Sequence, residues 1–496
     1  MNRELFMDHC HRGGFEVAEA SCRAISGTVC GIAEKDGKKQ FLIAGDSNDT
    51  IKDDFSGKET QAGDMTVLVC PLSEANAAAL RKYFPFTAPV SLKGKKATIG
   101  LGDRLGIATG AHIKAISGTG VFPVLAQQSK RELTLTGRTN RSMMDDVAWQ
   151  VFEAGYESGY AADGDHLKTL EEVKAALEDG DTMITLDCSE HIDNAAGAMD
   201  DEEAVAISRA ERNSAAAERL DRLYLGRKFP VEGFEITFSE AELARFYLIY
   251  GDALIFAERV FQEAIVPCGR SVSLEISIDE TETETTPNAH YFVASELLRN
   301  GVAFESMAPR FCGEFQKGID YIGDLERFKA EFSVHARIAA QLGYRISVHS
   351  GSDKFSVFPC IGELSDGIFH LKTSGTSWVE AVRVIAMCDP VLFRRMVKFS
   401  CTKYEEAKKF YCVSGMAEKI PLIDSVPDQE LPDLVSEPDA RQVMHITYGF
   451  LLQEKDQKGN YVFRDDIYKV LRGNRQCMEN VLAAHIRKHI EHLGVK

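Results

Sequence analysis

The chain has 496 residues, of which 44% are hydrophobic and 27% are charged, and its formal net charge is −18. This length exceeds one ordinary core, and the composition is typical of a folded globular protein. The negative charge disfavours nucleic acid and anionic membrane surfaces as partners, although a few local cations can still bind a small anion. The 12 cysteines include no C-x-x-C pair, which argues against a zinc ribbon or a thioredoxin-like dithiol.

The sequence carries no recognisable targeting signal. Its first residues, MNRELFMDHC, mix charged and apolar side chains and lack the continuous apolar stretch of a secretory signal. No run approaches the roughly 20 apolar residues that a membrane helix requires. We therefore expect a cytoplasmic protein with no membrane partner.

Residues 1–90 predict a small mixed α/β domain, in which alternating apolar residues are followed by an alanine-rich helix at 73–83. From residue 97, short β-rich runs alternate with helical segments, a pattern typical of repeated βα units around a parallel sheet. The predicted strands are Ala97–Leu101, Val121–Leu125, Tyr160–Asp163, Met183–Leu186, Ser271–Ile278, Val302–Ser306, Arg345–Val348 and Phe369–Lys372. Eight such units predict a (β/α)₈ TIM barrel as the catalytic domain, at 91–400.

Three further segments are predicted to be helical. Thr169 and Glu172 form a T-x-x-E capping box that opens a helix between the third and fourth strands, and Gly180 ends it. The acidic, alanine-rich stretch at 189–231 indicates a helical insertion, which we interpret as a lid or a subunit contact. Residues 401–496 predict a mainly helical C-terminal extension. The oligomeric state stays open, with a homo-oligomer as one alternative.

In a TIM barrel the active site lies at the carboxyl ends of the strands, and polar residues follow all eight predicted strands. His166 and His349 each end an apolar run and are expected to point at the mouth of the barrel. Two histidines with carboxylates suit a catalytic divalent transition metal. By contrast, three histidines near the chain end fit the C-terminus of a helix, where cations are favoured: His485, His489 and His492.

Other residues at the strand ends suit the remaining ligands and the substrate. Glu314, Glu275 and Asp187 are rival carboxylates for the metal. Arg310 follows a proline, and its guanidinium can hold a carboxylate through two parallel hydrogen bonds, whereas Lys354 offers a point charge. A structural salt bridge is an equal alternative for both. The residues expected at the substrate are Arg310, Lys168, Asp187, Ser352, Lys354 and Lys372.

Several long runs resemble the tagaturonate epimerase family. They are ADGDHLKT at 162–169, MITLDCSEHID at 183–193, APRFCGEFQKGIDYIGDLERF at 308–328, VHSGSDKFSVFP at 348–359 and FHLKTSGTSWVEA at 369–381. The resemblance covers about residues 85–400 and includes irregular loops as well as strands. It implies a metal-dependent enzyme of hexuronate catabolism that interconverts D-tagaturonate and D-fructuronate at carbon 4, with a small sugar acid as its partner.

The resemblance also implies a role for individual residues. Asp165 is the expected proton acceptor and Glu275 the expected proton donor, while the metal ligands are His166, Glu314 and His349. Asp187 and Glu282 stay open as alternatives to the two glutamates. Because nitrogen and oxygen ligands suit zinc, manganese, cobalt, nickel and iron alike, the sequence does not identify the cation.

The chemistry favours a particular route. Carbon 4 is β to the carbonyl at carbon 2, so the carbonyl does not acidify its proton, whereas a retro-aldol and aldol step through a metal-stabilised enediolate avoids this difficulty. Two alternatives remain: a class II ketose aldolase that releases its fragments, and a non-catalytic barrel that serves as an accessory subunit. The many titratable groups at the strand ends argue against the second.

Overall fold

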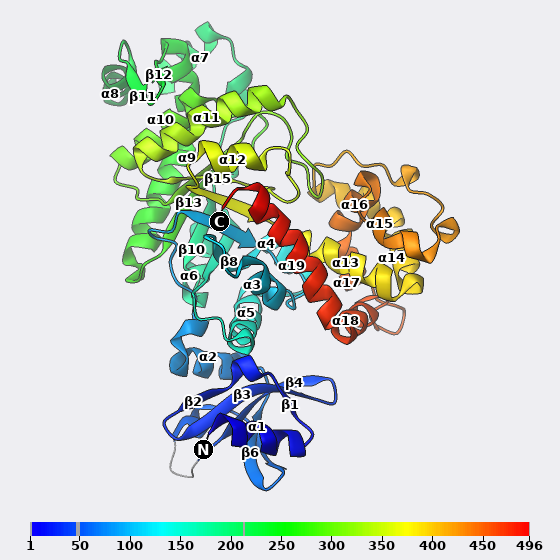
Figure 1. Cartoon of the computed structure of the whole chain (residues 1–496). Coiled ribbons are helices and arrows are strands. Elements are labelled where there is room, and N and C mark those ends of the chain that lie inside the picture. Colours follow the sequence, from blue (N-terminus) through cyan, green and yellow to red (C-terminus); the bar gives the residue numbers. More distant parts are fainter. Residues whose placement is uncertain (1, 46–49, 212–213, 496) are drawn as a thin grey trace.

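The computed structural model describes residues 2–45, 50–211 and 214–495. Its centre is a closed barrel of parallel strands in the order β10-β13-β14-β15-β16-β7-β8-β9 (Figure 1). The strands are β7 (Ala97–Leu101), β8 (Phe122–Ser129), β9 (Ala161–Leu167), β10 (Met183–Asp187), β13 (Ser273–Ile278), β14 (Ser306–Pro309), β15 (Arg345–Val348) and β16 (Phe369–Thr373). The predicted (β/α)₈ barrel is confirmed.

The predicted sixth strand is misplaced by several residues. Val302–Ser306 was expected to be extended, but β14 begins only at Ser306. The backbone N–H of Val302 donates to the carbonyl oxygen of Leu297, 2.9 Å away, and so closes the end of α10 (Pro287–Arg299). Val302 is apolar and buried because it packs beneath this helix end, not because it belongs to a strand.

The predicted capping box is confirmed at α6 (Leu170–Asp179). Thr169 Oγ1 accepts from the Glu172 backbone N–H at 3.2 Å, and the Glu172 carboxylate accepts from the Thr169 N–H at 3.3 Å. Gly180 ends the helix with φ 109°, a left-handed conformation that other residues rarely adopt. The helix is thereby fixed at both ends directly after β9, which carries the site.

An antiparallel sheet precedes the barrel and lies below it in Figure 1. Its strands are β1 (Glu16–Val17), β2 (Arg23–Ile25), β3 (Thr28–Lys35), β4 (Lys38–Ala44), β5 (Lys58–Ala62) and β6 (Met65–Cys70). Phe41 of β4 packs against Trp149 and Phe152 of α5 (Asn140–Ala154), with ring centroids 5.5 Å apart in both pairs. This aromatic cluster joins the sheet to the barrel.

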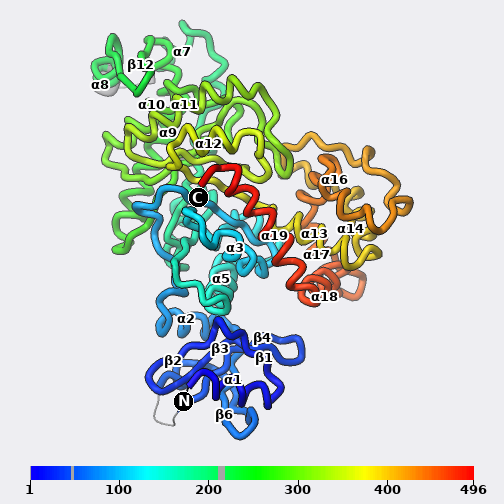
Figure 2. The backbone as a smooth tube through the Cα atoms, in the orientation of Figure 1, coloured from blue at the N-terminus to red at the C-terminus, as the bar shows by residue number. Residues whose placement is uncertain are grey.

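The insertion between β10 and β13 lies at the opposite end of the molecule from the sheet (Figure 2). Its elements are α7 (Asp201–Glu211), α8 (Ser214–Tyr224), β11 (Phe229–Val231), β12 (Phe234–Ile236) and α9 (Glu240–Val260). Residues 212–213 of the predicted helical insertion lie outside the described residues. Its interpretation as a lid or subunit contact stays a prediction.

The C-terminal extension is mainly helical and packs along the barrel. Its longer helices are α14 (Pro390–Ala407), α16 (Pro438–Ile446), α18 (Arg464–Gly473) and α19 (Arg475–His492). In Figure 1, α19 crosses the barrel beside α3 (Thr109–Ile116) and α13 (Thr376–Cys388). The chain therefore ends close to the strands that carry the site.

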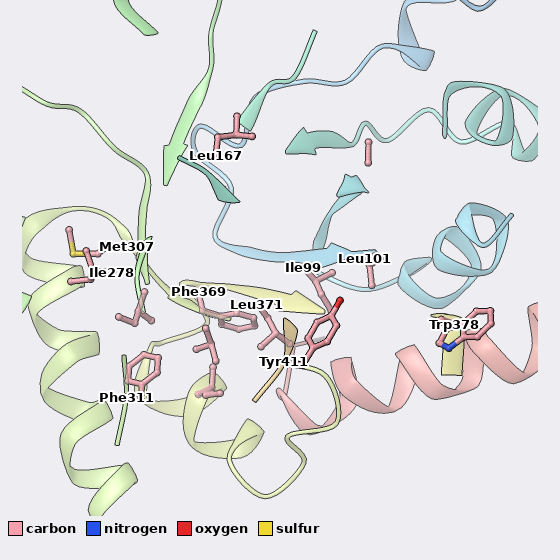
Figure 3. Close-up of a cluster of buried hydrophobic side chains, with 14 of the residues drawn as sticks. Ile99, Leu101, Leu167, Ile278, Met307, Phe311, Phe369, Leu371, Trp378 and Tyr411 are labelled. Atoms are coloured by element: carbon pink, nitrogen blue, oxygen red, sulfur yellow. The ribbon is translucent and has the colours of Figure 1, made fainter. Parts of the chain in front are cut away.

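A large apolar cluster fills the space between strands and helices (Figure 3). Ile99 of β7, Leu371 of β16 and Trp378 of α13 are fully buried in it. Each such side chain contributes about 1.5–3 kcal/mol relative to exposure. None of the helices in the described part of the chain is long and apolar enough to cross a membrane.

The contact between α12 (Phe358–Leu364) and the end of α19 allows a stability test. A Cβ added at Gly362 would lie 1.9 Å from the carbonyl oxygen of Leu493, which is backbone and cannot rotate away. We expect Gly362→Ala to lower the free energy of unfolding by about 1–3 kcal/mol, measured by urea denaturation. Gly473→Ala is the matched control, because no atom lies within 4 Å of its added Cβ. Equal stability of both variants would contradict the packing described here.

Candidate active site at the carboxyl ends of the barrel strands

A cavity of about 590 Å³ opens at the carboxyl ends of the strands. Its titratable lining includes Asp165, His166, Asp187, Asp279, Glu280, His349 and Lys372. A second cavity, of about 430 Å³, adjoins it and shares Asp279, Glu280 and His349 with it. These groups come from different strands and meet only because the barrel closes.

A bulge in β9 directs His166 to the mouth of the barrel. The pairing of β9 with β10 shifts by one residue between Gly164 and Leu167, and His166 has φ 55°. Adjacent residues of a regular strand point to opposite faces, so an extra residue is what allows Asp165 and His166 to face one cavity. A left-handed non-glycine residue carries strain, which is commonly retained at functional sites.

The two predicted histidines lie side by side, as expected for ligands of one cation. The ring centroids of His166 and His349 are 4.9 Å apart and the rings are nearly perpendicular. His166 Nδ1 lies 3.3 Å from Asp187 Oδ2. Burial lowers the pKa of His166, but Asp165 and Asp187 more than offset this effect, so the pKa is raised above its usual value.

His349 lies between two carboxylates. Its Nε2 is 2.7 Å from Glu275 Oε1, and its Nδ1 is 3.0 Å from Asp279 Oδ1. Burial lowers the pKa of His349, but the negative charges of Asp279 and Glu275 outweigh burial and raise it to about 10. Without a metal, His349 is therefore a cation at neutral pH.

Lys372 binds the acids at the base of the cavity. Its ammonium lies 2.7 Å from Asp163 Oδ2, 2.6 Å from Asp165 Oδ1 and 3.3 Å from Glu275 Oε1. Burial raises the pKa of Asp165, but Lys372 and His166 reverse the effect and lower it to about 2. Asp165 is consequently ionised at neutral pH, as a proton acceptor must be.

Glu275, the predicted proton donor, is fully buried beside the cavity. It accepts a hydrogen bond from Ser306 Oγ at 2.7 Å and contacts His349 and Lys372. Burial raises its pKa, but the two cations lower it well below the usual value, so the carboxyl group is ionised in this arrangement. Its role as proton donor stays a prediction.

The donor set fits a divalent cation. Ligand atoms of His166, Asp187 and Glu280 lie within 4.8 Å of one another. The buried Nδ1 of His349 has no aligned hydrogen-bond acceptor among the described residues, which leaves it available to a metal. Glu314, the carboxylate expected from the resemblance, is exposed, accepts from Gln316 Nε2 at 2.5 Å and lines the adjoining cavity instead.

A second group of possible ligands is already satisfied by protein contacts. Asp353 accepts from Arg441 at 2.7 Å and lies 2.6 Å from His485 Nε2, while its backbone N–H donates to His489 Nε2 at 3.0 Å. The lone pair that His489 would offer a metal is therefore in use. The prediction that these histidines merely balance a helix C-terminus misses this role, because α19 uses them to hold the loop after β15.

Lys168 and Arg310, both predicted at the substrate, line different cavities. The Lys168 ammonium faces the first cavity, 3.7 Å from Asp187 Oδ2. Arg310 lines the adjoining cavity, where its guanidinium donates to the carbonyl oxygen of Thr281. Their roles toward a substrate stay predictions.

Lys354 and Ser352 do not line either of these two cavities, and their predicted place at the substrate stays a prediction. The buried Lys354 ammonium donates to the carbonyl oxygens of Gln316, Ile319 and Ser352 at 2.8, 2.6 and 2.9 Å, so all three of its hydrogens are in use. Ser352 Oγ donates to the carbonyl oxygen of Ser374 at 3.2 Å. Both residues hold loops together because a buried donor needs an acceptor.

Among the cavity residues that sequence reasoning misses are Arg131, Lys317 and Tyr411. Arg131 lies in the first turn of α4 (Lys130–Thr136), which follows β8 directly, and Tyr411 comes from the C-terminal extension. Lys317 lies in the long loop after β14, within the FCGEFQKGID stretch that resembles the known family. That resemblance is the one signal that pointed to Lys317, because no strand-end pattern reaches so far into a loop.

A TIM barrel with this cavity defines an enzyme that acts on a small molecule. The family model described as tagaturonate epimerase matches residues 18–493. The tagaturonate/fructuronate epimerase of Thermotoga maritima is 40% identical over 489 residues, which is 98% of each chain. The native crystal structure of the fructuronate-tagaturonate epimerase from Cohnella laeviribosi has a TM-score of 0.95 and 43% identity, covering 100% of this chain and 99% of that one.

A glycerol complex of the Cohnella laeviribosi enzyme matches equally well, with a TM-score of 0.95 and 99% of each chain covered. The chain therefore belongs to the tagaturonate epimerase family, which confirms the resemblance found in the sequence. It is an enzyme of the isomerase class. The family model and the related structures match nearly the whole chain, including the predicted barrel.

The raised pKa of His349 predicts a pH-dependent stability of the metal-free protein. A raised pKa stabilises the fold fully below the unfolded value of about 6.5, and this contribution is lost as pH rises through the folded value of about 10. We expect the difference in unfolding free energy between the wild type and His349→Asn to shrink from pH 7 to pH 10, measured by urea denaturation with chelator. A constant difference would contradict the charged state of His349.

Proposed function

We propose that this enzyme interconverts D-tagaturonate and D-fructuronate by epimerising carbon 4, as its relatives' names indicate for those proteins. The observation that carries the proposal is the meeting of His166 and His349 beside the Asp165–Lys372 ion pair in one cavity. A hexuronate is small enough for a cavity of about 590 Å³. The same proposal includes a role for the enzyme in hexuronate catabolism and its location in the cytoplasm.

We further propose that His166, His349, Asp187 and Glu280 hold a divalent cation, with Glu314 as the alternative carboxylate. The convergence of donor atoms of His166, Asp187 and Glu280 within 4.8 Å and the ring of His349 beside that of His166, with centroids 4.9 Å apart, support this assignment. When bound, such a cation would supply Lewis-acid stabilisation of negative charge at a keto group. Imidazole and carboxylate ligands fit several first-row metals. Glu275, which contacts Nε2 of His349, would orient this imidazole for metal binding.

The chain's own residues supply the proton transfers. Asp165 is ionised and faces the cavity, so it can accept the proton of the carbon 4 hydroxyl. The C3–C4 bond then breaks, its electron pair passing toward carbons 3 and 2, and carbon 4 becomes an aldehyde. Rotation of the aldehyde and re-addition from its other face inverts carbon 4, and the new alkoxide regains a proton.

Lys372 keeps the acceptor in its reactive form. It pairs with Asp165 and Asp163, so the proton taken from the substrate enters a site where the carboxyl groups outnumber the cation. The inverted hydroxyl needs a proton, and Glu275 is the donor that the family resemblance indicates. Because its carboxyl group is ionised in this arrangement, Glu275 has to take up a proton before it can act as this donor. Retention of the aldehyde in the cavity separates an epimerase from an aldolase.

The proposed activity is tested by stripping the purified protein of metal, reloading it with single divalent metals and following fructuronate formation from tagaturonate. We expect activity only with added metal. Turnover in heavy water should leave carbon 4 free of deuterium, because the retro-aldol route does not break its C–H bond. Deuterium at carbon 4 would exclude this route, and net release of three-carbon products would indicate an aldolase.

His349→Ala tests the metal site separately. Removing one imidazole should weaken metal binding by at least 10-fold, read directly as metal content after dialysis, and should abolish the epimerase activity. His11→Ala is the control, because His11 is exposed on α1 (Arg3–Arg12) and lies outside the cavity. Full metal content in His349→Ala would refute the assignment.

Asp165→Asn tests the proton acceptor. An amide of the same size cannot take the hydroxyl proton, so kcat should fall by roughly 10²- to 10⁴-fold, the usual contribution of general base catalysis. Metal content and the unfolding midpoint are measured alongside, to show that the site is otherwise intact. A kcat within threefold of the wild type would remove Asp165 from the mechanism.

A further inference from the structure

Two cations at the cavity lack the acidic partner that the other cations have. Lys130 pairs with Glu172, Lys168 with Asp187, and Lys372 with Asp163 and Asp165; Arg131 and Lys317 have no carboxylate oxygen of the described residues within 4.0 Å. Both line the first cavity and the adjoining one. They are therefore cavity cations whose charge no close ion pair balances, and the negative charges of Glu132 and Glu280 act on them only from beyond 4.0 Å.

Neutral groups hold both cations in place. The Lys317 ammonium donates to Ser350 Oγ at 3.0 Å and to Ser374 Oγ at 3.4 Å. The Arg131 guanidinium lies 4.6 Å from the centre of the Tyr411 ring and donates to the Phe410 carbonyl oxygen at 3.1 Å. None of these contacts neutralises charge, and the buried Nε of Arg131 has no hydrogen-bond partner among the described residues.

The two cations also repel each other. Burial lowers the pKa of Lys317, and the positive charge of Arg131 is the next largest cause of that lowering. Two like charges that share a partly buried cavity are costly unless an anion joins them. An arrangement that keeps both, fixed by neutral contacts, is complementary to a ligand that brings its own negative charge.

We propose that Lys317 and Arg131 form the subsite that binds the carboxylate of the sugar-acid substrate and so set both its specificity and its orientation. This inference rests on the proposed function for the identity of the substrate. Asp165, Asp187 and Asp279 line the same cavity and repel a carboxylate. The carboxylate end of the substrate consequently lies toward Lys317 and Arg131, and the keto end toward the histidines.

The subsite has a further use in the proposed reaction. Cleavage between carbons 3 and 4 leaves the carboxylate on the aldehyde fragment, the part that must rotate. Binding of the carboxylate keeps this fragment in the cavity while its aldehyde group turns, since rotation about the C4–C5 bond does not move the anchored end. Both fragments then stay available for re-addition.

The inference is tested with Lys317→Met, which keeps the length of the side chain and removes its charge. Binding of tagaturonate is measured by calorimetry on metal-loaded enzyme, with tagatose as the uncharged counterpart that bears a hydroxymethyl group in place of the carboxylate. We expect the Kd for tagaturonate to rise roughly 10- to 100-fold, the usual worth of a hydrogen bond to a charged group, and the Kd for tagatose to stay within twofold. Arg131→Met should behave alike.

Lys130→Met is the matched control, because the neighbouring Lys130 is exposed and already paired with Glu172. Its Kd for tagaturonate should match the wild type, and Lys317→Arg should recover much of the lost binding. Wild-type affinity of Lys317→Met for tagaturonate, or an equal loss of tagatose binding, would overturn the inference. A wild type that binds tagaturonate without epimerising it would refute the proposed function and leave this subsite standing.

Discussion

The site depends on one buried ammonium among carboxylates. Lys372 lies within 3.3 Å of Asp163 and Asp165 of β9 and of Glu275 of β13, and these carboxylates would repel one another without it. A buried charge that loses its partner costs several kcal/mol, so the lysine and the acids stabilise each other. The acids in turn determine the charge of His166 and His349. The charge states of the cavity residues therefore depend on the Lys372 ammonium on β16.

The geometry of the cavity has separate origins. The closed barrel brings the strand ends together, and the bulge in β9 adds the local adjustment that turns His166 toward His349. Loops and the C-terminal extension supply Lys317 and Tyr411, which no strand carries. The strand ends thus carry the residues of the proposed chemistry, whereas Lys317 and Tyr411 at the proposed carboxylate subsite come from a loop and from the C-terminal extension.

The sequence allowed the barrel, the family and the central pair of histidines to be predicted, because apolar periodicity and strand-end polarity are local signals. It could not show that the Lys354 ammonium donates its hydrogen bonds to backbone carbonyl groups or that His485 contacts Asp353. Both contacts join segments that are far apart in the chain. Val302 misled the strand assignment because a residue packed beneath a helix end is as apolar as one in a strand. Arg131 was not predicted because its distinguishing feature is that no carboxylate lies close to it. Only the folded structure shows which side chains lie close together.

The contact of α19 with Asp353 couples a distant helix to the site. Asp353 lies four residues after His349, whereas its partners His485 and His489 lie 132 and 136 residues further along the chain. The loop that bears His349 is therefore held by contacts of long sequence separation, which form only once α19 has docked on the barrel. Local opening of α19 would release this loop while the strands stay paired, so the order of the site depends on a helix that does not line its cavity.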